Sequence, residues 1–125
     1  MIYGTGVDII EIKRIQNSLT KFSPRFEEKV FTDNEIRYCQ SQADPVKHFA
    51  ARFAVKEAVS KSLGTGISKE VGLKDIEVVN QDSGKPLVVM NGQGKKLFEK
   101  LNLKCIHISI SHDKHYAIAQ AIAEQ

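Results

Sequence analysis

The chain of 125 residues contains no tryptophan, only two cysteines and only three prolines. The cysteines, Cys39 and Cys105, are too few and too far apart in the sequence for a disulfide framework or a zinc site. Free thiols are typical of proteins of the reducing cytoplasm, which is the location we expect. The aromatic fraction of 7% disfavours a surface that stacks nucleic-acid bases, so we expect no nucleic-acid partner.

Long apolar runs are also absent. No segment approaches the roughly 20 apolar residues that a membrane-spanning helix needs. The first residues, MIYGTGVDII, lack the positive region and apolar stretch of a signal peptide, so we expect no membrane contact. The length suits one domain over residues 1–125 with one modest core. The net charge of +3 is a mild excess that favours acidic or phosphate-bearing partners.

The pattern of apolar residues predicts an α+β domain, with helices mostly in the first half and an antiparallel sheet mostly in the second. The expected strands cover residues 2–7, 75–79, 87–90, 105–111 and 116–124. The expected helices are one that begins after Asp8, one opened by Ser23-Pro24, one over about 33–41, a long one between Asp44-Pro45 and Gly64, and one over 95–101. The patterns GxxxxGK[ST] and GxGxxG of phosphate-binding loops do not occur.

The long predicted helix has charged residues on the side that should be buried. In FAARFAVKEAVSKSLGTG (49–66) the large apolar residues fill one broad arc of the helical wheel. Arg52 and Lys56 fall inside that arc, and buried charges need partners. Either their aliphatic stems lie along apolar surface with the charged ends in water, or the arc faces an oligomer interface or an anionic ligand such as a phosphate.

Two further residues of this helix and one near the chain start have open interpretations. Glu57 and Lys61 are one turn apart on an alanine-rich face. They form either a surface ion pair or a site that holds a metal and a phosphate side by side, since alanines let a ligand or another backbone come close. Asp8 is either a helix N-cap or a ligand for a hard metal ion, and a carboxylate used by an amide is less available to a metal.

Other polar residues give weaker indications. Lys13, Arg14, Lys21 and Arg25 lie together in the first helical region, as a solvated face or as a docking surface for an acidic protein. Ser109 and His112 are expected to belong to a polar strand face that runs into a turn, rather than to act as nucleophile and base. His107 and His115 are expected at the surface.

Four segments together are similar to one family. GTGVDIIEIKRI (4–15), FAARFAVKEAVSKSLGTG (49–66), SGKP (83–86) and SISH (109–112) resemble the motifs of the holo-acyl-carrier-protein synthases, the small 4′-phosphopantetheinyl transferases. The resemblance covers nearly the whole chain. It implies transfer of the 4′-phosphopantetheine arm of coenzyme A to a serine of an acyl carrier protein, with adenosine 3′,5′-bisphosphate as the other product. It also implies magnesium, and a homotrimer with active sites at subunit interfaces.

The resemblance assigns roles to residues of this chain. It implies that Asp8 and Glu57 bind the metal and that Lys61 contacts the pyrophosphate; Glu57 is the first candidate for the general base and Asp8 the second. The expected coenzyme-binding residues are Arg52, Lys61, Gly64, Gly84, Lys85, Pro86 and His112. The expected contacts to the carrier protein are Arg14 and, more loosely, Lys13, Lys21 and Arg25.

Two other classes of function compete with this one. The first is a non-catalytic module that binds an acidic protein or a nucleotide, but it gives no reason for Asp8 and Glu57 to converge with Lys61. The second is a metal-dependent phosphodiesterase, in which water replaces the serine. The basic first helix counts mildly against it, because a small diester needs no surface for protein docking.

Overall fold

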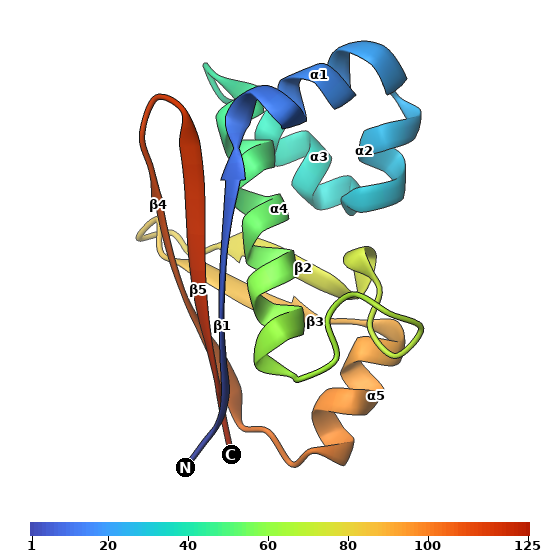
Figure 1. Cartoon of the computed structure of the whole chain (residues 1–125), viewed down its shortest axis with the longest axis vertical. Coiled ribbons are helices and arrows are strands. Elements are labelled where there is room, and N and C mark those ends of the chain that lie inside the picture. The colour runs from blue at the N-terminus through green and yellow to red at the C-terminus, as the bar shows by residue number, and fades with distance from the viewer.

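A computed structural model describes all residues, 1–125, and shows an α+β architecture in which one long helix packs against an antiparallel sheet (Figure 1). The elements in chain order are β1 (Ile2–Glu11), α1 (Ile12–Phe22), α2 (Arg25–Val30), α3 (Asp33–Gln40), α4 (Pro45–Ser62), a 3-10 turn (Leu73–Asp75), β2 (Ile76–Asn80), β3 (Pro86–Met90), α5 (Gly92–Lys100), β4 (Cys105–His112) and β5 (Tyr116–Glu124). The predicted fold class and order of elements are confirmed. None of the helices is both long and apolar enough to cross a membrane.

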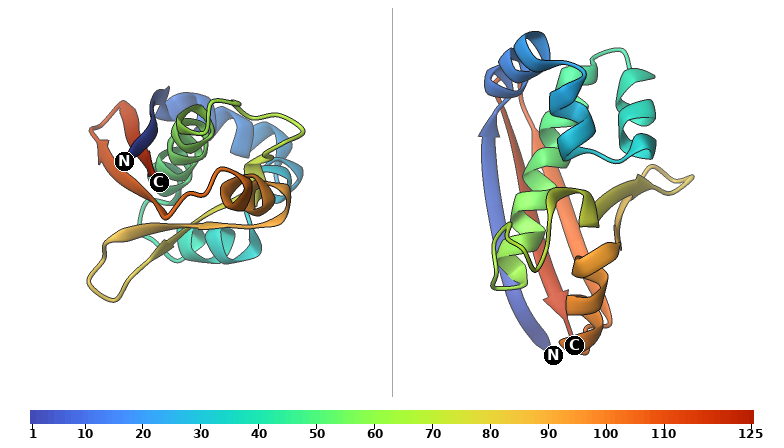
Figure 2. Two further views of the ribbon diagram at one scale, coloured as in Figure 1. Left: turned by 90° about the horizontal axis from the view of Figure 1, so that it is seen from below. Right: turned by 90° about the vertical axis from the view of Figure 1, so that its right-hand side faces the viewer.

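The main sheet joins the two ends of the chain. Its strand order is β1-β5-β4, all antiparallel, so the first strand pairs with the last and the termini lie side by side (Figure 1). The buried face of β5 consists of alternate alanines, Ala117, Ala119, Ala121 and Ala123, whose small side chains let α4 pack closely. The β2–β3 hairpin forms a separate two-stranded sheet that protrudes from the body (Figure 2).

The first strand is longer than the sequence pattern predicts. It continues through Asp8, which pairs with Ala119 of β5, and α1 begins only at Ile12 with Glu11 as its N-cap. The β-branched residues before Glu11 favour an extended backbone and continue the ladder. The interpretation of Asp8 as a helix N-cap is therefore wrong, and no backbone amide of a helix start uses its carboxylate.

Two glycines of β1 allow the strand to lie directly on α4. A Cβ atom added at Gly6 would be 1.9 Å from the carbonyl oxygen of Ala58, and one at Gly4 would be 2.2 Å from that of Ser62. Both obstacles are backbone atoms, which cannot swing away as a side chain can. The alanine-rich face of α4 thus receives another backbone, that of β1, and this contact places Asp8 beside α4.

We expect Gly6→Ala to lower the free energy of unfolding by about 3 kcal/mol or more, because the new methyl group must separate β1 from α4. Gly72→Ala is the matched control: Gly72 has an ordinary extended backbone, and its added Cβ would meet only side-chain atoms of Asp75, the nearest at 3.6 Å. Urea unfolding followed by circular dichroism would measure both. Equal losses in the two variants would contradict the close approach of β1 to α4.

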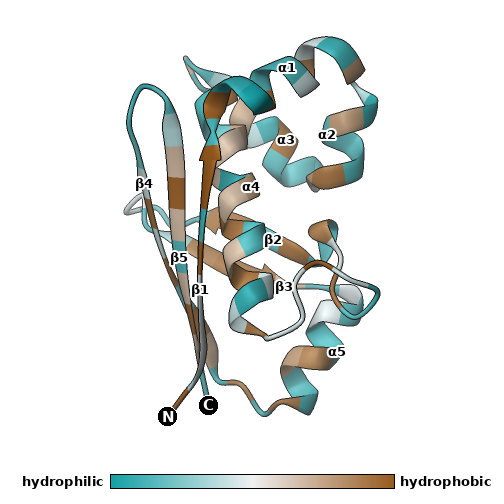
Figure 3. Ribbon diagram, viewed as in Figure 1, coloured by the Kyte–Doolittle hydropathy of each residue, from teal (hydrophilic) through white to brown (hydrophobic).

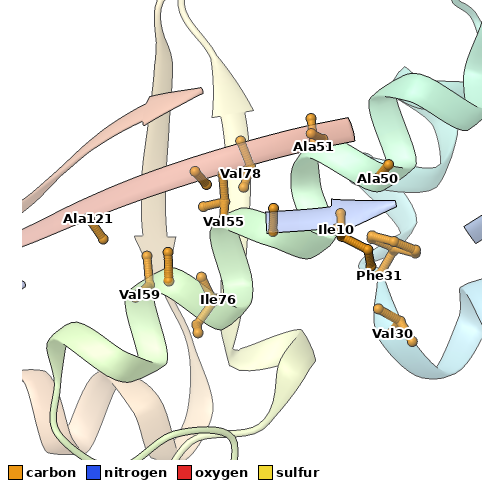
Figure 4. Packing of buried hydrophobic residues seen from close by; sticks show 14 of the residues in the cluster. Ile10, Val30, Phe31, Ala50, Ala51, Val55, Val59, Ile76, Val78 and Ala121 are labelled. Atoms are coloured by element: carbon orange, nitrogen blue, oxygen red, sulfur yellow. The ribbon is translucent and has the colours of Figure 1, made fainter. Parts of the chain in front are cut away.

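Helix α4 is buried on nearly every side rather than along one stripe. Eleven of its 18 residues are buried. Val55 and Val59 lie among Ala121 of β5 and Ile76 and Val78 of β2 (Figure 4). This packing explains why the sequence of α4 shows no clean amphipathic pattern, and why apolar and polar bands follow one another along it (Figure 3).

The buried charge of Lys56 is neutralised inside the chain. Its side chain has no exposed surface, and Nζ lies 2.7 Å from Glu35 Oε1. The ammonium also donates to the carbonyl oxygens of Leu73, at 2.9 Å, and Ile76. The other Glu35 oxygen accepts from the amide of Val78 at 2.9 Å. Both interpretations of Lys56 are therefore wrong: its charged end does not reach water, and neither an oligomer interface nor a phosphate neutralises it.

Candidate active site

The packing of β1 on α4 brings Asp8, Glu57 and Lys61 together, as the sequence predicts. Lys61 Nζ lies 3.1 Å from Asp8 Oδ1 and donates to the carbonyl oxygen of Val7 at 3.0 Å. Lys61 makes no ion pair with Glu57, although the two are one helical turn apart. The interpretation of Glu57 and Lys61 as a surface ion pair is therefore wrong, and the side chain of Glu57 has no hydrogen-bond partner in the chain.

The two carboxylates repel each other. The pKa of Glu57 is raised, first by partial burial and then by the charge of Asp8, while Lys61 acts in the opposite direction. A divalent cation between Asp8 and Glu57 would relieve this repulsion. Both side chains offer only hard oxygen ligands, which Mg²⁺ prefers and supplements with water and phosphate oxygens. The residues present therefore fit a magnesium ion.

A cavity of about 330 Å³ opens beside these carboxylates. Asp8, Glu57 and Arg14 provide its charged groups. The rest of its lining comprises Ile9, Ile10, Ile15, Ser18, Phe26 and Phe53. The apolar lining was not predicted, because in the sequence these residues are indistinguishable from ordinary core positions of a strand and three helices.

A second cavity of about 330 Å³ gathers four of the predicted coenzyme-binding residues, Arg52, Gly84, Pro86 and His112. They come from α4, from the β2–β3 hairpin and from the end of β4. Four further polar residues of this cavity were not predicted as ligand-binding groups, namely Tyr38, His48, Asn80 and Ser109. Only Ser109 had a signal, in the SISH segment; the others lie outside the four segments that carry the resemblance.

Arg52 gives the second cavity an anion-binding character. Its side chain is buried, donates from Nη2 to Asn80 Oδ1 at 2.6 Å, and lies 4.1 Å above the Tyr38 ring centroid. Its Nε has no hydrogen-bond partner, and a buried unpaired donor is costly until a ligand accepts from it. The pKa of His48 is lowered by burial and then by the charges of Arg52 and His112, as expected where cations converge.

The two cavities share no residue. Arg52 and Glu57 are five residues apart on α4, so their side chains leave the helix about 140° apart. Lys85, in the exposed hairpin turn, and Gly64, in the turn after α4 at φ 84°, line neither cavity. A single chain therefore does not bring all of the predicted site residues together.

The predicted docking residues lie on the exposed side of α1 and at the start of α2. Arg14 lines the cavity of Asp8 and Glu57, and Lys13 lines a neighbouring depression together with Lys114. Lys21 and Arg25 are exposed farther along. None of these cations has a carboxylate within ion-pair distance, so their charge is available to a partner.

Comparison with known proteins points to one family. Residues 4–121 match the model described as the 4′-phosphopantetheinyl transferase superfamily. A holo-[acyl-carrier-protein] synthase of Koribacter versatilis is 44% identical over 99% of both chains. The crystal structure of the Neisseria meningitidis synthase is 33% identical and matches all of both chains with a TM-score of 0.94. A Bacillus anthracis synthase in complex with coenzyme A (3′,5′-ADP) is 41% identical, with a TM-score of 0.84 over 100% of this chain and 98% of that one.

Proposed function

Because the chain belongs to the 4′-phosphopantetheinyl transferase superfamily, we propose that it transfers the 4′-phosphopantetheine arm of coenzyme A to a serine hydroxyl of an apo acyl carrier protein. The other product is adenosine 3′,5′-bisphosphate. The observation that supports this most strongly is that Lys61 contacts Asp8 at the side of a cavity that Asp8, Glu57 and Arg14 line. Two carboxylates and an ammonium suit a metal-bound pyrophosphate, and the unpaired arginine suits an acidic protein. Both cysteines are free, which is typical of proteins of the reducing cytoplasm, and we propose that the enzyme is located there.

The residues of this site divide the chemistry among them. Asp8 and Glu57 would hold magnesium, which neutralises the charge that develops on the phosphoryl oxygens. Lys61 would turn its ammonium from Asp8 to an oxygen of the pyrophosphate. The serine oxygen forms a bond to the phosphorus that bears the pantetheine arm, and the bond to the leaving bisphosphate breaks. Glu57, with its raised pKa, is our first candidate to accept the serine proton and Asp8 the second.

The nucleotide half of coenzyme A would occupy the second cavity. The unpaired Nε of Arg52 and the ring of His112 can donate to phosphate oxygens there, while Gly84 and Pro86 provide a wall for the adenine. Lys85 extends from the same hairpin turn and can reach a phosphate from outside the cavity. Gly64 would contribute by ending α4 just after Lys61.

We propose that the chain forms a homotrimer in which the Asp8 site of one subunit faces the Arg52 cavity of the next. The outward face of the sheet supports this arrangement, since Val7, Ile9, Tyr116 and Ile118 are 55%, 61%, 45% and 39% exposed. Ile9 pairs directly with Ile118, and Val7 and Tyr116 lie two residues from this pair on the same face of the sheet. Exposed apolar patches of this kind are typical of interfaces.

Mixed assemblies would test the shared site. Glu57→Gln and Arg52→Gln, each inactive alone, should regain activity when the two variants are co-expressed and purified together through different tags. A subunit with an intact Asp8 site would then meet one with an intact Arg52 cavity. Mixed assemblies that stay inactive would contradict a site built from two subunits.

Arg14→Ala should raise the KM for the carrier protein about tenfold at low salt, with little change in kcat. The loss of one unpaired cation removes attraction to an acidic partner, and salt screens that attraction, so the difference from wild type should shrink at high ionic strength. Steady-state kinetics at two salt concentrations would measure it. Lys100→Ala, on the distant helix α5, is the matched control and should not change the KM.

The alternative functions differ in their need for the acceptor serine. A phosphodiesterase would release adenosine 3′,5′-bisphosphate from coenzyme A without a carrier protein, and a binding module would release none. We expect release only with apo carrier protein, and none with a carrier whose acceptor serine is alanine. Chromatography of the nucleotide products decides among the three.

A further inference from the structure

A cluster of three metal-binding side chains lies on the main sheet, away from the proposed active site. Cys105 and His107 are two residues apart on β4, so they share one face, and Cys105 pairs directly with Glu124 of β5. Their face points away from α4, because the opposite face of β5 holds the buried alanines. Along β5, Glu124 is five residues, or about 17 Å, from the residue that pairs with Asp8.

The three ligand atoms form a compact triangle. Cys105 Sγ lies 3.2 Å from His107 Nε2 and 3.3 Å from Glu124 Oε1, and the last two atoms are 2.9 Å apart. In tetrahedral zinc sites, the usual bond lengths place such atoms about 3.4–3.6 Å apart. A shift of about half an ångström or less would therefore fit them to one face of a zinc tetrahedron. In the single chain His107 and Glu124 have room for it, since their side chains are 60% and 40% exposed.

We propose that Cys105, His107 and Glu124 bind one divalent ion of the zinc class, with water in the fourth position. A thiolate and an imidazole prefer such borderline ions, whereas the oxygen-only pair of Asp8 and Glu57 prefers magnesium. The chain thus has two metal sites of different chemical preference. The ion joins the first residue of β4 to the last residue of β5 and stabilises the end of the sheet at which both chain termini lie (Figure 1).

The sequence could not indicate this site. The two cysteines are both free, and burial raises the pKa of the Cys39 thiol to about 12. The side chains that Cys105 contacts are instead those of the exposed His107 and of Glu124 from the last strand. Only the pairing of β4 with β5 brings them together.

Cobalt titration of the full chain tests the proposal directly. Wild type should bind one Co²⁺ with a thiolate-to-metal absorption band in the near ultraviolet, and one equivalent of Zn²⁺ should remove that band. Cys105→Ser should lack the band. His107→Ala should bind zinc about 100-fold more weakly, since even the loss of an outer hydrogen bond to a ligand costs 10–100-fold. Zinc should raise the melting temperature of wild type, because it binds the folded form.

Two variants serve as controls. His115→Ala removes an exposed histidine outside the cluster, and Glu57→Gln removes a ligand of the proposed magnesium site; both should keep the cobalt band and the zinc affinity. The proposal is overturned if wild type shows no thiolate band, if Cys105→Ser keeps it, or if His107→Ala binds zinc as tightly as wild type. A zinc affinity lost in Glu57→Gln would also overturn it, because the bound ion would then lie at the other site.

Discussion

Glu57→Gln should lower the turnover of phosphopantetheine transfer at least about 100-fold while the protein keeps its fold. Glutamine has the same shape but lacks the charge that binds a metal or accepts a proton. The side chain of Glu57 makes no hydrogen bond or ion pair in the chain, so folding loses no contact. Glu70→Gln, at an exposed position, is the matched control and should retain full activity.

The difference in stability between wild type and Glu57→Gln should depend on pH in a defined direction. The pKa of Glu57 is raised above 4.5 in the folded protein, so the folded state binds a proton more tightly than the unfolded one. The stability that this gives the metal-free protein is present at low pH and is lost as the pH rises through the raised pKa. Melting temperatures without metal should therefore shift in favour of Glu57→Gln as the pH rises above 4.5. Magnesium should then raise the melting temperature of wild type only; an equal rise in both proteins would contradict the role of Glu57 as a ligand.

Glu35→Ala should lower the free energy of unfolding by about 3–5 kcal/mol, because it leaves the fully buried ammonium of Lys56 without its counter-charge. The double variant Glu35→Leu with Lys56→Met should recover part of the loss, since two apolar side chains of similar size need no counter-charge, while the amide of Val78 lacks its acceptor in both variants. Urea unfolding of wild type, the single variant and the double variant would measure this. A double variant less stable than Glu35→Ala would contradict the account.

The single variant also has an expected pH dependence. Burial already lowers the pKa of Lys56, and Glu35 opposes that effect. Without Glu35 the folded state should hold the proton of Lys56 less tightly still, so the unfolded state binds more protons. The stability of Glu35→Ala should therefore increase from pH 7 to pH 9 relative to wild type. An unchanged difference between the two proteins would mean that Lys56 finds another counter-charge.

The sequence was informative where a local pattern decides the structure. Thr32 and Glu35 follow the capping-box pattern, and α3 begins at Asp33 with both capping hydrogen bonds. The apolar alternation of CIHISIS and YAIAQAIAE predicted the β4–β5 hairpin that the structure shows. These features depend on neighbours along the chain, which a pattern can represent.

The sequence was less informative where distant residues meet. The partner of Lys56 is 21 residues away, and Lys61 pairs with Asp8, 53 residues away, rather than with Glu57 on its own helix. Helix α1 begins at Ile12 rather than just after Asp8, because pairing with β5 extends the first strand. The local sequence around Asp8 does not indicate this pairing. The residues of the site were predicted by resemblance, whereas their hydrogen bonds and their division between two cavities required the structure.

The most direct test of the proposed function is the intact mass of an apo acyl carrier protein after incubation with this enzyme, coenzyme A and magnesium. A parallel reaction contains a chelator. We predict that the carrier gains the mass of one phosphopantetheine arm in the first reaction and none in the second. A carrier that gains the arm equally with chelator would contradict the metal role of Asp8 and Glu57. If several well-folded carriers gain no mass while coenzyme A still binds, the chain is not a transferase of this kind.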